Sequence, residues 1–308
     1  MNALEVRNLT KKFGPPAGGF TAVDQISFEL GEGEILGFLG PNGAGKTTTL
    51  QMLVGTLTPT EGEISYFGKS LFTNREEILD QLNYSTTYTN LPWNLSVKEN
   101  LTFISYLYTI KNRKKRLEEI VESFKLQDLM KQTVGSLSAG QKTRVNLAKA
   151  FLNYPKVLLL DEPTASLDPD IAKYLRDFIL NQRKEYKISI LFTSHNMREV
   201  EEVCDRVIFI NHGKIIANDT PLQLAKKIDA TEIEILPESS VAHFLKFCEK
   251  NKISTEVAGK HIVLKVKEKE VAGLLRDLTN EKLEYSEISI NKPTLEDYFL
   301  KVSMDKPL

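Results

Sequence analysis

The chain has 308 residues, which suits one large and one small domain, and its 41% hydrophobic and 26% charged residues are ordinary for a globular protein. A formal net charge of −1 gives no reason to expect a nucleic-acid partner. The N-terminus lacks the apolar stretch of a signal peptide, and no apolar run approaches the length of a membrane span. Any membrane role therefore requires another polypeptide. The two cysteines, Cys204 and Cys248, lack metal-site spacing and are expected to be reduced thiols in a cytoplasmic protein.

Short β-rich runs alternate with helical patterns up to about residue 220, which predicts an α/β domain with a largely parallel sheet. The predicted strands are 4–9, 26–30, 34–39, 64–67, 156–160 and 188–193, followed by a hairpin at 207–216. The predicted helices are an insert at about 96–131, then 139–153, one capped by Asp168 with Pro169 in its first turn, and 196–203. The insert opens with a capping box at Ser96 and Glu99, and the charge run at 112–116 favours a solvated helix start.

The pattern changes after a short helix at 220–228. The order strand, helix, strand, strand, helix, strand over 231–290, with a last helix at 294–301, predicts a small α+β sandwich. We therefore expect an α/β domain at 1–228, with a helical subdomain at about 88–150, and an accessory α+β domain at 229–308.

A glycine-rich stretch fits the phosphate-loop pattern, because it follows an apolar strand and precedes a helix. Its glycines let the backbone point N–H groups at phosphate oxygens, and the helix N-terminus adds a positive dipole end. We expect Lys46 to reach the β- and γ-phosphates and Thr47 to hold Mg²⁺. The residues predicted to contact the nucleotide here are Gly40, Pro41, Asn42, Gly43, Ala44, Gly45, Lys46, Thr47 and Thr48.

Two carboxylates, Asp161 and Glu162, end the apolar run at 157–160. Asp161 is placed to bind Mg²⁺ through water, and Glu162 to polarise the attacking water. Hydrolysis needs both roles, because positioning and charge stabilisation dominate phosphoryl transfer. Downstream of a phosphate loop, this acidic pair indicates nucleotide hydrolysis.

These motifs, in this order, resemble the ATP-binding subunit of an ABC transporter over residues 3–220. The stretch 137–141 resembles the family's signature motif, and Asp161-Glu162 its Walker B motif. The stretch 166–168 resembles its D-loop, and 193–195 its H-loop. The residues that the resemblance adds to the site are Ser138, Gly140, Gln141 and Asp168 at the nucleotide, and His195 at the γ-phosphate beside Glu162. The catalytic residues that it implies are Glu162, His195 and Lys46.

The resemblance implies a P-loop NTPase fold, ATP and Mg²⁺ as ligands, and two partners. Ser138 caps a helix whose first N–H groups can hold a γ-phosphate bound to the loop of a second copy, so that two ATP molecules join a homodimer. The other implied partner is a separate transmembrane permease, which would hold the protein at the cytoplasmic face of the membrane.

Three positions depart from the family pattern. Ala139 replaces the usual first Gly of the signature, a mild change because Gly140 remains. Phe13 stands where the family places an adenine-stacking aromatic, and a long following loop makes Phe20 an alternative. Thr87 stands where the family has a Gln that touches Mg²⁺ and links the site to the permease, so that a water-mediated or weaker contact is expected. The candidate metal ligands are Thr47, Asp161 and Thr87.

Two further features concern the partner. Trp93 lies in a loop on the surface that receives a helix of the permease in ABC proteins, and it either anchors that docking or caps the local core. The tail at 292–300 is similar to that of ATPases paired with exporters of the daunorubicin-resistance type. For the C-terminal piece itself we favour a packing or dimer-stabilising role without substrate contact.

The sequence therefore predicts an ATP-hydrolysing subunit that couples dimer closure to substrate export through a permease. One alternative is a soluble ABC ATPase that acts on the ribosome or DNA. The single motif set, the lack of heptads and the lack of basic excess argue against it. The other is a regulatory module that binds ATP without turnover, and the presence of Glu162 and His195 argues against that.

Overall fold

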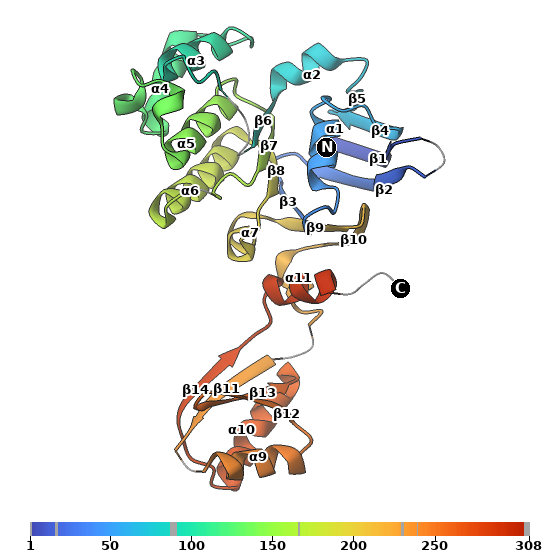
Figure 1. Ribbon diagram of the computed structural model, residues 1–308, viewed down its shortest axis with the longest axis vertical. Helices are drawn as coiled ribbons and strands as arrows, with labels where there is room; N and C mark the ends of the chain where they lie inside the picture. The colour runs from blue at the N-terminus through green and yellow to red at the C-terminus, as the bar shows by residue number, and fades with distance from the viewer. Residues whose placement is uncertain are drawn as a thin grey trace. The chain divides into compact units, whose positions relative to one another are not determined.

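A computed structural model describes residues 2–15, 18–86, 91–165, 167–228, 231–238 and 240–304. The chain forms two compact units, Met1–Pro221 and Leu222–Leu308 (Figure 1). The domains predicted at 1–228 and 229–308 stay a prediction. Each unit is described by itself below.

The first unit is built around a six-stranded sheet with the order β10-β9-β3-β8-β7-β6. Its first five strands from the β6 side run parallel, and β10 pairs antiparallel with β9, as the predicted hairpin requires. The strands are β3 (Ile35–Leu39), β6 (Leu82–Thr86), β7 (Val157–Asp161), β8 (Ser189–Thr193), β9 (Arg206–Asn211) and β10 (Lys214–Asp219). The strands β3 and β8 are buried at every position, because a parallel sheet is covered on both faces.

A second sheet of the first unit is antiparallel, with the order β2-β1-β4-β5. Its strands are β1 (Asn2–Phe13), β2 (Phe20–Gly31), β4 (Glu61–Tyr66) and β5 (Lys69–Ser70). The helix α1 (Lys46–Leu53) packs into one core with residues of both sheets, through Leu50, Met52 and Leu53. The sequence patterns located β1, β2 and β4 but not β5, and they did not separate this sheet from the parallel one.

The remaining helices of the first unit follow the predicted order, except that α2 was not predicted. They are α2 (Arg75–Gln81), α3 (Val97–Ser105), α4 (Arg113–Ser123), α5 (Ala139–Ala150), α6 (Pro169–Tyr186) and α7 (Met197–Val203), with α8 (Pro221–Ala225) at the division between the units. The capping box that starts α3 is confirmed, since Ser96 and Glu99 each accept a hydrogen bond from the other's backbone N–H.

The sequence predicts a solvated charge run at the start of α4, but one residue of the run is buried. Arg116 is buried and donates hydrogen bonds to the carbonyl oxygens of Phe151 (2.5 Å) and Leu152 (3.2 Å) just beyond the end of α5. Its guanidinium also lies 3.6 Å from the centre of the Tyr154 ring. The prediction is wrong at Arg116 because the unsatisfied carbonyls at a helix end attract a donor with several N–H groups.

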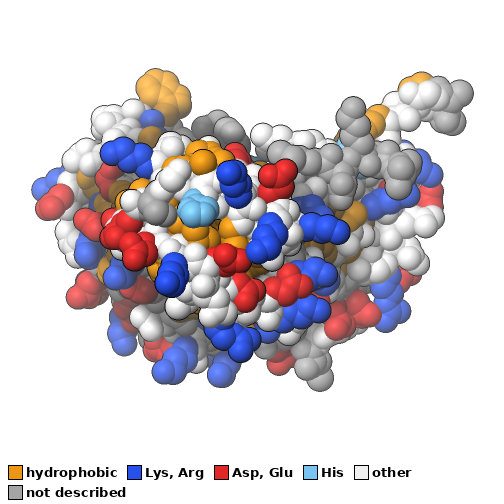
Figure 2. Space-filling model, turned by 90° about the horizontal axis from the view of Figure 1, so that it is seen from below, with side chains coloured by type: hydrophobic (Ala, Val, Ile, Leu, Met, Phe, Trp, Pro, Cys, Tyr) orange, Lys and Arg blue, Asp and Glu red, His pale blue; other side chains and the backbone are white. Residues whose placement is uncertain are grey.

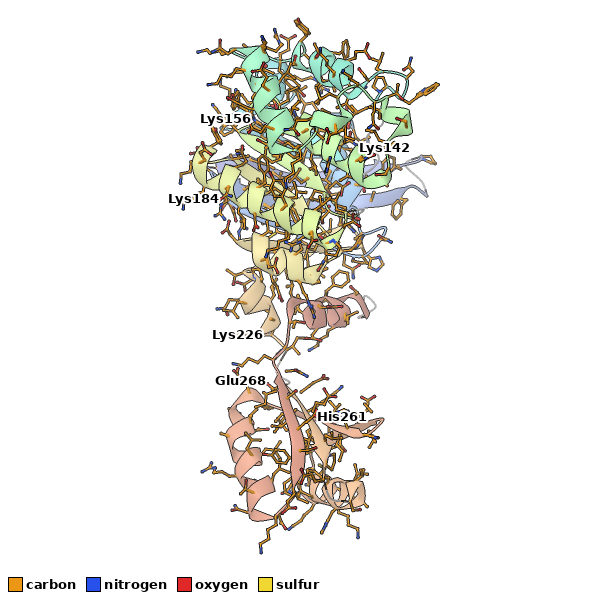
Figure 3. The ribbon with its side chains drawn as sticks, turned by 90° about the vertical axis from the view of Figure 1, so that its left-hand side faces the viewer. Lys142, Lys156, Lys184, Lys226, His261 and Glu268 are labelled. Carbon is orange, nitrogen blue, oxygen red and sulfur yellow. The ribbon has the colours of Figure 1, made fainter. Side chains whose placement is uncertain are left out.

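The second unit has the predicted order strand, helix, strand, strand, helix, strand. Its elements are β11 (Thr231–Pro237), α9 (Val241–Lys250), β12 (Ser254–Ala258), β13 (His261–Val266), α10 (Val271–Asn280), β14 (Tyr285–Asn291) and α11 (Leu295–Met304). The antiparallel sheet β12-β13-β11-β14 shares an apolar core with α9 and α10. Cross-strand pairs mark its polar face: Lys265 lies 3.3 Å from Glu232, and His261, labelled in Figure 3, lies 3.6 Å from Glu234.

The surface in Figure 2 carries Lys and Arg side chains interspersed with Asp and Glu. This face therefore has no large area of one sign of charge. Within the described ranges, no helix combines the length and the apolar character that a membrane crossing needs.

Candidate nucleotide-hydrolysis site

The parallel register brings three polar side chains together at the carboxyl edge of the central sheet. Thr86 on β6 pairs with Asp161 on β7, and Asp161 pairs with Thr193 on β8. The phosphate loop follows β3, which lies next to β8 in the sheet. Ligands of open parallel sheets bind at this edge, so the fold gathers the predicted motifs where a nucleotide would lie.

Two glycines of the loop occupy positions that no other residue fits. A Cβ atom on Gly40 would lie 2.1 Å from the carbonyl oxygen of Ile210. Gly45 has a φ of +106°, and its Cβ would lie 2.5 Å from the carbonyl oxygen of Ala22. The loop can therefore pack against β9 and β2 only because these side chains are absent.

Lys46 begins α1 and its side chain curls back over the loop. Its Nζ atom donates hydrogen bonds to the carbonyl oxygens of Gly40 (2.6 Å) and Pro41 (3.1 Å). Burial lowers the pKa of this ammonium, and the nearby carboxylates of Glu162 and Asp161 oppose the shift. The charge is thus half-buried and available to phosphate oxygens at the N-terminus of a helix.

A cavity of about 410 Å³ joins the loop, the acidic pair and two aromatic rings. Its lining residues are Phe13, Phe20, Ala22, Asn42, Gly43, Gly45, Lys46, Thr47, Thr48, Asp161 and Glu162. Phe13 and Phe20 stand opposite each other in the β1–β2 pairing, 43% and 64% exposed. Both rings can therefore reach a base, and the choice between them stays a prediction.

The buried hydroxyl of Thr193 orients both carboxylate residues of the site. It donates a hydrogen bond to Oδ1 of Asp161 (2.7 Å) and accepts one from the backbone N–H of Glu162 (3.0 Å). The Tyr84 hydroxyl donates to Oδ2 of Asp161 over 3.4 Å. Burial, aided by the charge of Asp161, raises the pKa of Tyr84 to about 12, so this hydroxyl stays a donor at neutral pH.

Glu162 and His195 form a close pair beyond the ends of β7 and β8. The Nε2 atom of His195 lies 2.7 Å from Oε1 of Glu162. Glu162 has a φ of +51°, in the left-handed region that a side chain with a Cβ rarely adopts. Such strain persists where surrounding contacts over-determine the backbone, often at functional sites. His195 and Glu162 both line a second cavity, of about 490 Å³, next to the first.

The residues present fit a magnesium ion. Thr47 and Asp161 line the same cavity and supply a hydroxyl and a carboxylate, the hard oxygen ligands that Mg²⁺ prefers. The described part of the chain, this site included, contains no group of three or more His, Cys, Asp or Glu that could hold a metal ion without further ligands. Mg²⁺ is typically held by few protein ligands together with substrate phosphates. Thr87, the third predicted ligand, lies outside the described residues, as does Ser166.

The signature residues lie at the start of α5. Ser138 and Gln141 form a reciprocal capping box, with Oγ of Ser138 accepting from the Gln141 N–H (3.3 Å) and Oε1 of Gln141 accepting from the Ser138 N–H (2.9 Å). Ser138 is exposed, and neither it nor Gly140 nor Gln141 lines the nucleotide cavity of its own chain. The helix end therefore faces outward, free to meet a ligand held elsewhere.

Asp168 precedes α6, with Pro169 in the first turn as predicted. Asp168 stands at the N-cap position, as predicted, but its exposed side chain makes no capping hydrogen bond, so the predicted side-chain cap is wrong. Pro169 has no N–H, which costs nothing at the first helical position, and the carboxylate of Asp168 remains available for other contacts. Asp168 does not line the nucleotide cavity either.

Sequence reasoning missed Tyr84 and Glu199. Tyr84 lies in β6, which the sequence did not predict as a strand because several of its residues are polar. Its contact to Asp161 also depends on β6 being the neighbour of β7 in the sheet. Glu199 lies in the first turn of α7, where an acidic residue is ordinary. Its burial is the unusual feature, and no local pattern in the sequence indicated it.

The chain is similar to known proteins in sequence and in fold. Residues 23–165 match the family model described as ABC transporter. The chain is similar to the bacitracin transport ATP-binding protein BcrA of Bacillus licheniformis, at 34% identity over 97% of this chain and 96% of the relative. It is also similar to the linearmycin resistance ATP-binding protein LnrL of Bacillus subtilis (strain 168), at 30% identity over 97% of this chain and 98% of that one.

Among solved structures, the ATP-binding subunit of an ABC transporter superposes with a TM-score of 0.67 at 27% identity, over 73% of this chain and 92% of that one. The chain belongs to the ATP-binding proteins of ABC transporters, with the P-loop ATPase fold of that family.

Proposed function

We propose that this protein is the ATP-hydrolysing subunit of an exporter, in which two copies close over two ATP molecules and drive a separate transmembrane permease. The observation that carries the proposal is the single cavity that joins the phosphate loop to Asp161 and Glu162, with His195 2.7 Å from Glu162. The rest of the proposal concerns the two partners.

The chemistry assigned to the chain's own residues is phosphoryl transfer to water. Lys46 and the loop N–H groups bind the β- and γ-phosphates, and Thr47 with Asp161 holds Mg²⁺, which when bound neutralises charge on the phosphate oxygens. Glu162 orients and polarises the attacking water. His195 contacts the γ-phosphate from the side on which Glu162 lies, and its imidazole is paired with the Glu162 carboxylate. Most of the rate gain comes from this positioning.

A second copy of the chain completes the site. The exposed capping box of Ser138 presents the free N–H groups of α5, a 12-residue helix, at a point that its own cavity does not reach. Helix N-termini bind phosphate well. The γ-phosphate held by one chain is therefore proposed to contact Ser138, Gly140 and Gln141 of the other chain. Asp168, which makes no cap of its own helix, is proposed to contact the nucleotide at the same interface.

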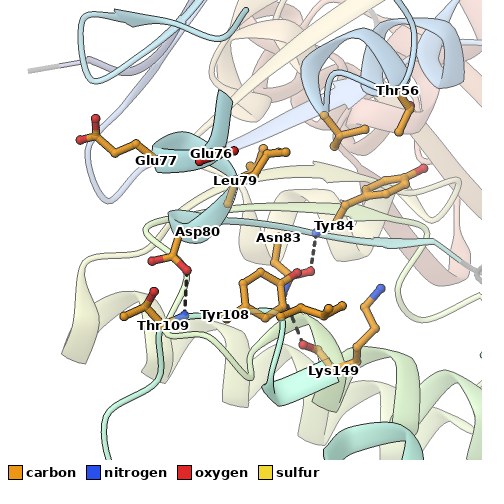
Figure 4. Close-up of a pocket in the computed structure, with 13 residues that line it drawn as sticks. Thr56, Glu76, Glu77, Leu79, Asp80, Asn83, Tyr84, Tyr108, Thr109 and Lys149 are labelled. Atoms are coloured by element: carbon orange, nitrogen blue, oxygen red, sulfur yellow. Dashed lines mark hydrogen bonds between the residues drawn. The ribbon is translucent and has the colours of Figure 1, made fainter. Parts of the chain in front are cut away.

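A groove in the first unit suits a segment of the permease. Its volume is about 750 Å³, and α2, β6, the stretch 107–109 and Lys149 of α5 line it (Figure 4). Asp80 accepts a hydrogen bond from the Thr109 N–H (2.9 Å), and Asn83 donates to the carbonyl oxygen of Lys149 (3.4 Å), so the walls are joined. Tyr84 lines the groove and contacts Asp161, and it therefore offers a direct link from a docked segment to the metal carboxylate.

Large apolar side chains stand exposed in the neighbouring helical subdomain. Trp93 is 75% exposed, which favours the docking alternative over a core-capping role. Phe103, Tyr106 and Leu107 are also exposed, and Leu107 lines the groove. Exposed aromatic residues of this kind are typical anchors of protein interfaces. A cytoplasmic protein with this surface would be held at the membrane by the permease.

The direction of transport is inferred from the relatives. BcrA is named for bacitracin transport and LnrL for linearmycin resistance, and both match the chain over nearly its full length. Resistance by transport requires outward movement, so we place this protein with an exporter.

The decisive experiment uses Glu162→Gln, which keeps the side chain's shape but removes the charge that polarises water. We expect this variant to bind ATP and Mg²⁺, to release no phosphate, and to accumulate as an ATP-bound dimer in light scattering. The wild-type chain should hydrolyse ATP and return to monomer. A Glu162→Gln variant that remains monomeric at saturating MgATP would contradict the two-copy site.

A further inference from the structure

A fully buried carboxylate lies next to the catalytic pair. Glu199 is 2% exposed, in the first turn of α7 and four residues after His195. Burial of a charged carboxylate costs free energy unless hydrogen bonds and opposite charges compensate it. The groups that hydrogen-bond to Glu199 therefore indicate why a carboxylate is buried at this position.

Two hydroxyl groups donate to the same oxygen of this carboxylate. Oε2 of Glu199 accepts hydrogen bonds from Thr164 Oγ1 (2.7 Å) and from Ser194 Oγ (2.8 Å). Hydrogen bonds to an ionised acceptor are shorter and stronger than neutral ones. Both distances are those of well-formed hydroxyl hydrogen bonds.

These two donors belong to the two segments that hold the catalytic pair. Thr164 follows Glu162 by two residues, and Ser194 directly precedes His195. The Ser194 hydroxyl also accepts a hydrogen bond from the Asn196 N–H (3.1 Å), which closes the turn around His195. One carboxylate thus joins the segment after β7 to the segment after β8. The three residues of this bridge line the second cavity, together with Glu162 and His195.

The third partner of Glu199 is Arg176, and this ion pair is not needed to hold α6 against α7. Arg176 on α6 lies 3.6 Å from Oε1 of Glu199, but it lies closer, at 2.9 Å, to the exposed Glu202. Among the described residues Oε1 of Glu199 makes no hydrogen bond. Arg176 would therefore keep an acidic partner between α6 and α7 even without Glu199.

We propose that Glu199 is a positioning residue for ATP hydrolysis, which fixes the separation of Glu162 and His195 through Thr164 and Ser194. The inference rests on the proposed function, because Glu199 acts only through that pair. The left-handed backbone of Glu162 needs outside contacts to persist, and the bridge supplies one two residues away. Rigid support of this kind is what a catalytic constellation requires.

The test uses Thr164→Val and Thr164→Ser in the full chain. Valine keeps the shape of threonine without the hydroxyl, whereas serine keeps the hydroxyl. We expect Thr164→Val to lower kcat by about 10- to 100-fold, the range that a misplacement of about 1 Å produces. KM for MgATP and Tm should stay near the wild-type values, and Thr164→Ser should recover most of kcat.

Two variants on α7 complete the design. Glu199→Gln keeps an acceptor oxygen but loses the charge, so a smaller fall in kcat is expected, again with KM preserved. Glu202→Gln is the matched control, because it removes the exposed carboxylate that shares Arg176 and touches neither catalytic segment. Its kcat should equal that of the wild type.

The outcomes separate this inference from the proposed function. A wild-type chain without Glu162-dependent hydrolysis would overturn both. Wild-type hydrolysis with an unchanged kcat in Thr164→Val would overturn the positioning role alone. So would a fall in kcat that only follows a fall in Tm, or an equal fall in Glu202→Gln.

Discussion

The hydroxyl of Thr193 donates a 2.7 Å hydrogen bond to Oδ1 of Asp161, across the parallel register of β8 and β7. Thr193 is completely buried, so water cannot replace this contact. The carboxylate that is proposed to hold Mg²⁺ is therefore oriented by the protein before any ligand arrives. Contacts of this kind to a metal ligand tune its affinity.

Thr193→Val is expected to raise the Mg²⁺ concentration for half-maximal ATPase activity by about tenfold, within the range seen when a metal ligand loses its hydrogen-bond partner. Valine fills the same space but cannot donate to Asp161. Thr193→Ser restores the hydroxyl and serves as the control. The measurement is phosphate release against Mg²⁺ at saturating ATP, and equal Mg²⁺ requirements in the Val and Ser variants would contradict the assignment.

Lys46→Met should weaken ATP binding by about 10² or more, because loss of one partner of a half-buried charge pair costs several kcal/mol. Methionine keeps the apolar stem of the side chain. Isothermal titration at neutral pH measures the affinity. Lys184→Met, on the exposed surface of α6 and labelled in Figure 3, should bind ATP as the wild type does.

The same lysine predicts how ATP affinity depends on pH. Burial lowers the Lys46 pKa in the free protein, and phosphate oxygens raise it again on binding. Binding should therefore take up protons at alkaline pH, and affinity should fall as the pH rises through the pKa of the free protein. Titrations in buffers with different ionisation enthalpies measure the uptake. If the uptake were the same in Lys46→Met, another group would be responsible.

The motif residues of the site could be predicted because each lies in a local strand-turn-helix context that the sequence shows directly. The phosphate loop after β3 and the acidic pair after β7 are of this kind. The contacts of Thr193, Tyr84 and Glu199 could not be, because they depend on which strands are neighbours and on their register. The pattern of polar Asn83 and Ser85 also hid β6, although both side chains are buried in the structure.

Arg116 shows the same limit in a helix. A run of basic residues at the start of α4 suggests solvent exposure, but the packing of α4 on α5 buries this one side chain at the end of α5. Arg116→Ala should destabilise the protein by about 2–4 kcal/mol, since it leaves buried carbonyl groups without a donor and removes the stack on Tyr154. A thermal melt should show Tm lower by about 5–10 °C.

Lys115→Ala is the matched control for that measurement. Lys115 precedes Arg116 on α4, its side chain is 76% exposed, and its pair with Glu119 spans 3.8 Å. Exposed pairs of this type contribute at most about 0.5 kcal/mol in helices. A Tm as low as that of Arg116→Ala would mean that charge on α4, rather than the buried contacts, supports the fold.

Trp93→Glu tests the docking surface. With 75% of the residue exposed, the substitution should leave Tm unchanged, while a charge at an apolar anchor should remove binding to a membrane partner. The measurement is recovery of a membrane protein with several membrane-spanning segments, together with the tagged chain, from its native host. Ile216→Glu, at an exposed apolar position on β10 away from the groove, is the control and should retain that protein. Equal recovery with Trp93→Glu would place the permease on a different surface, because a docked helix could not bury that carboxylate without a partner.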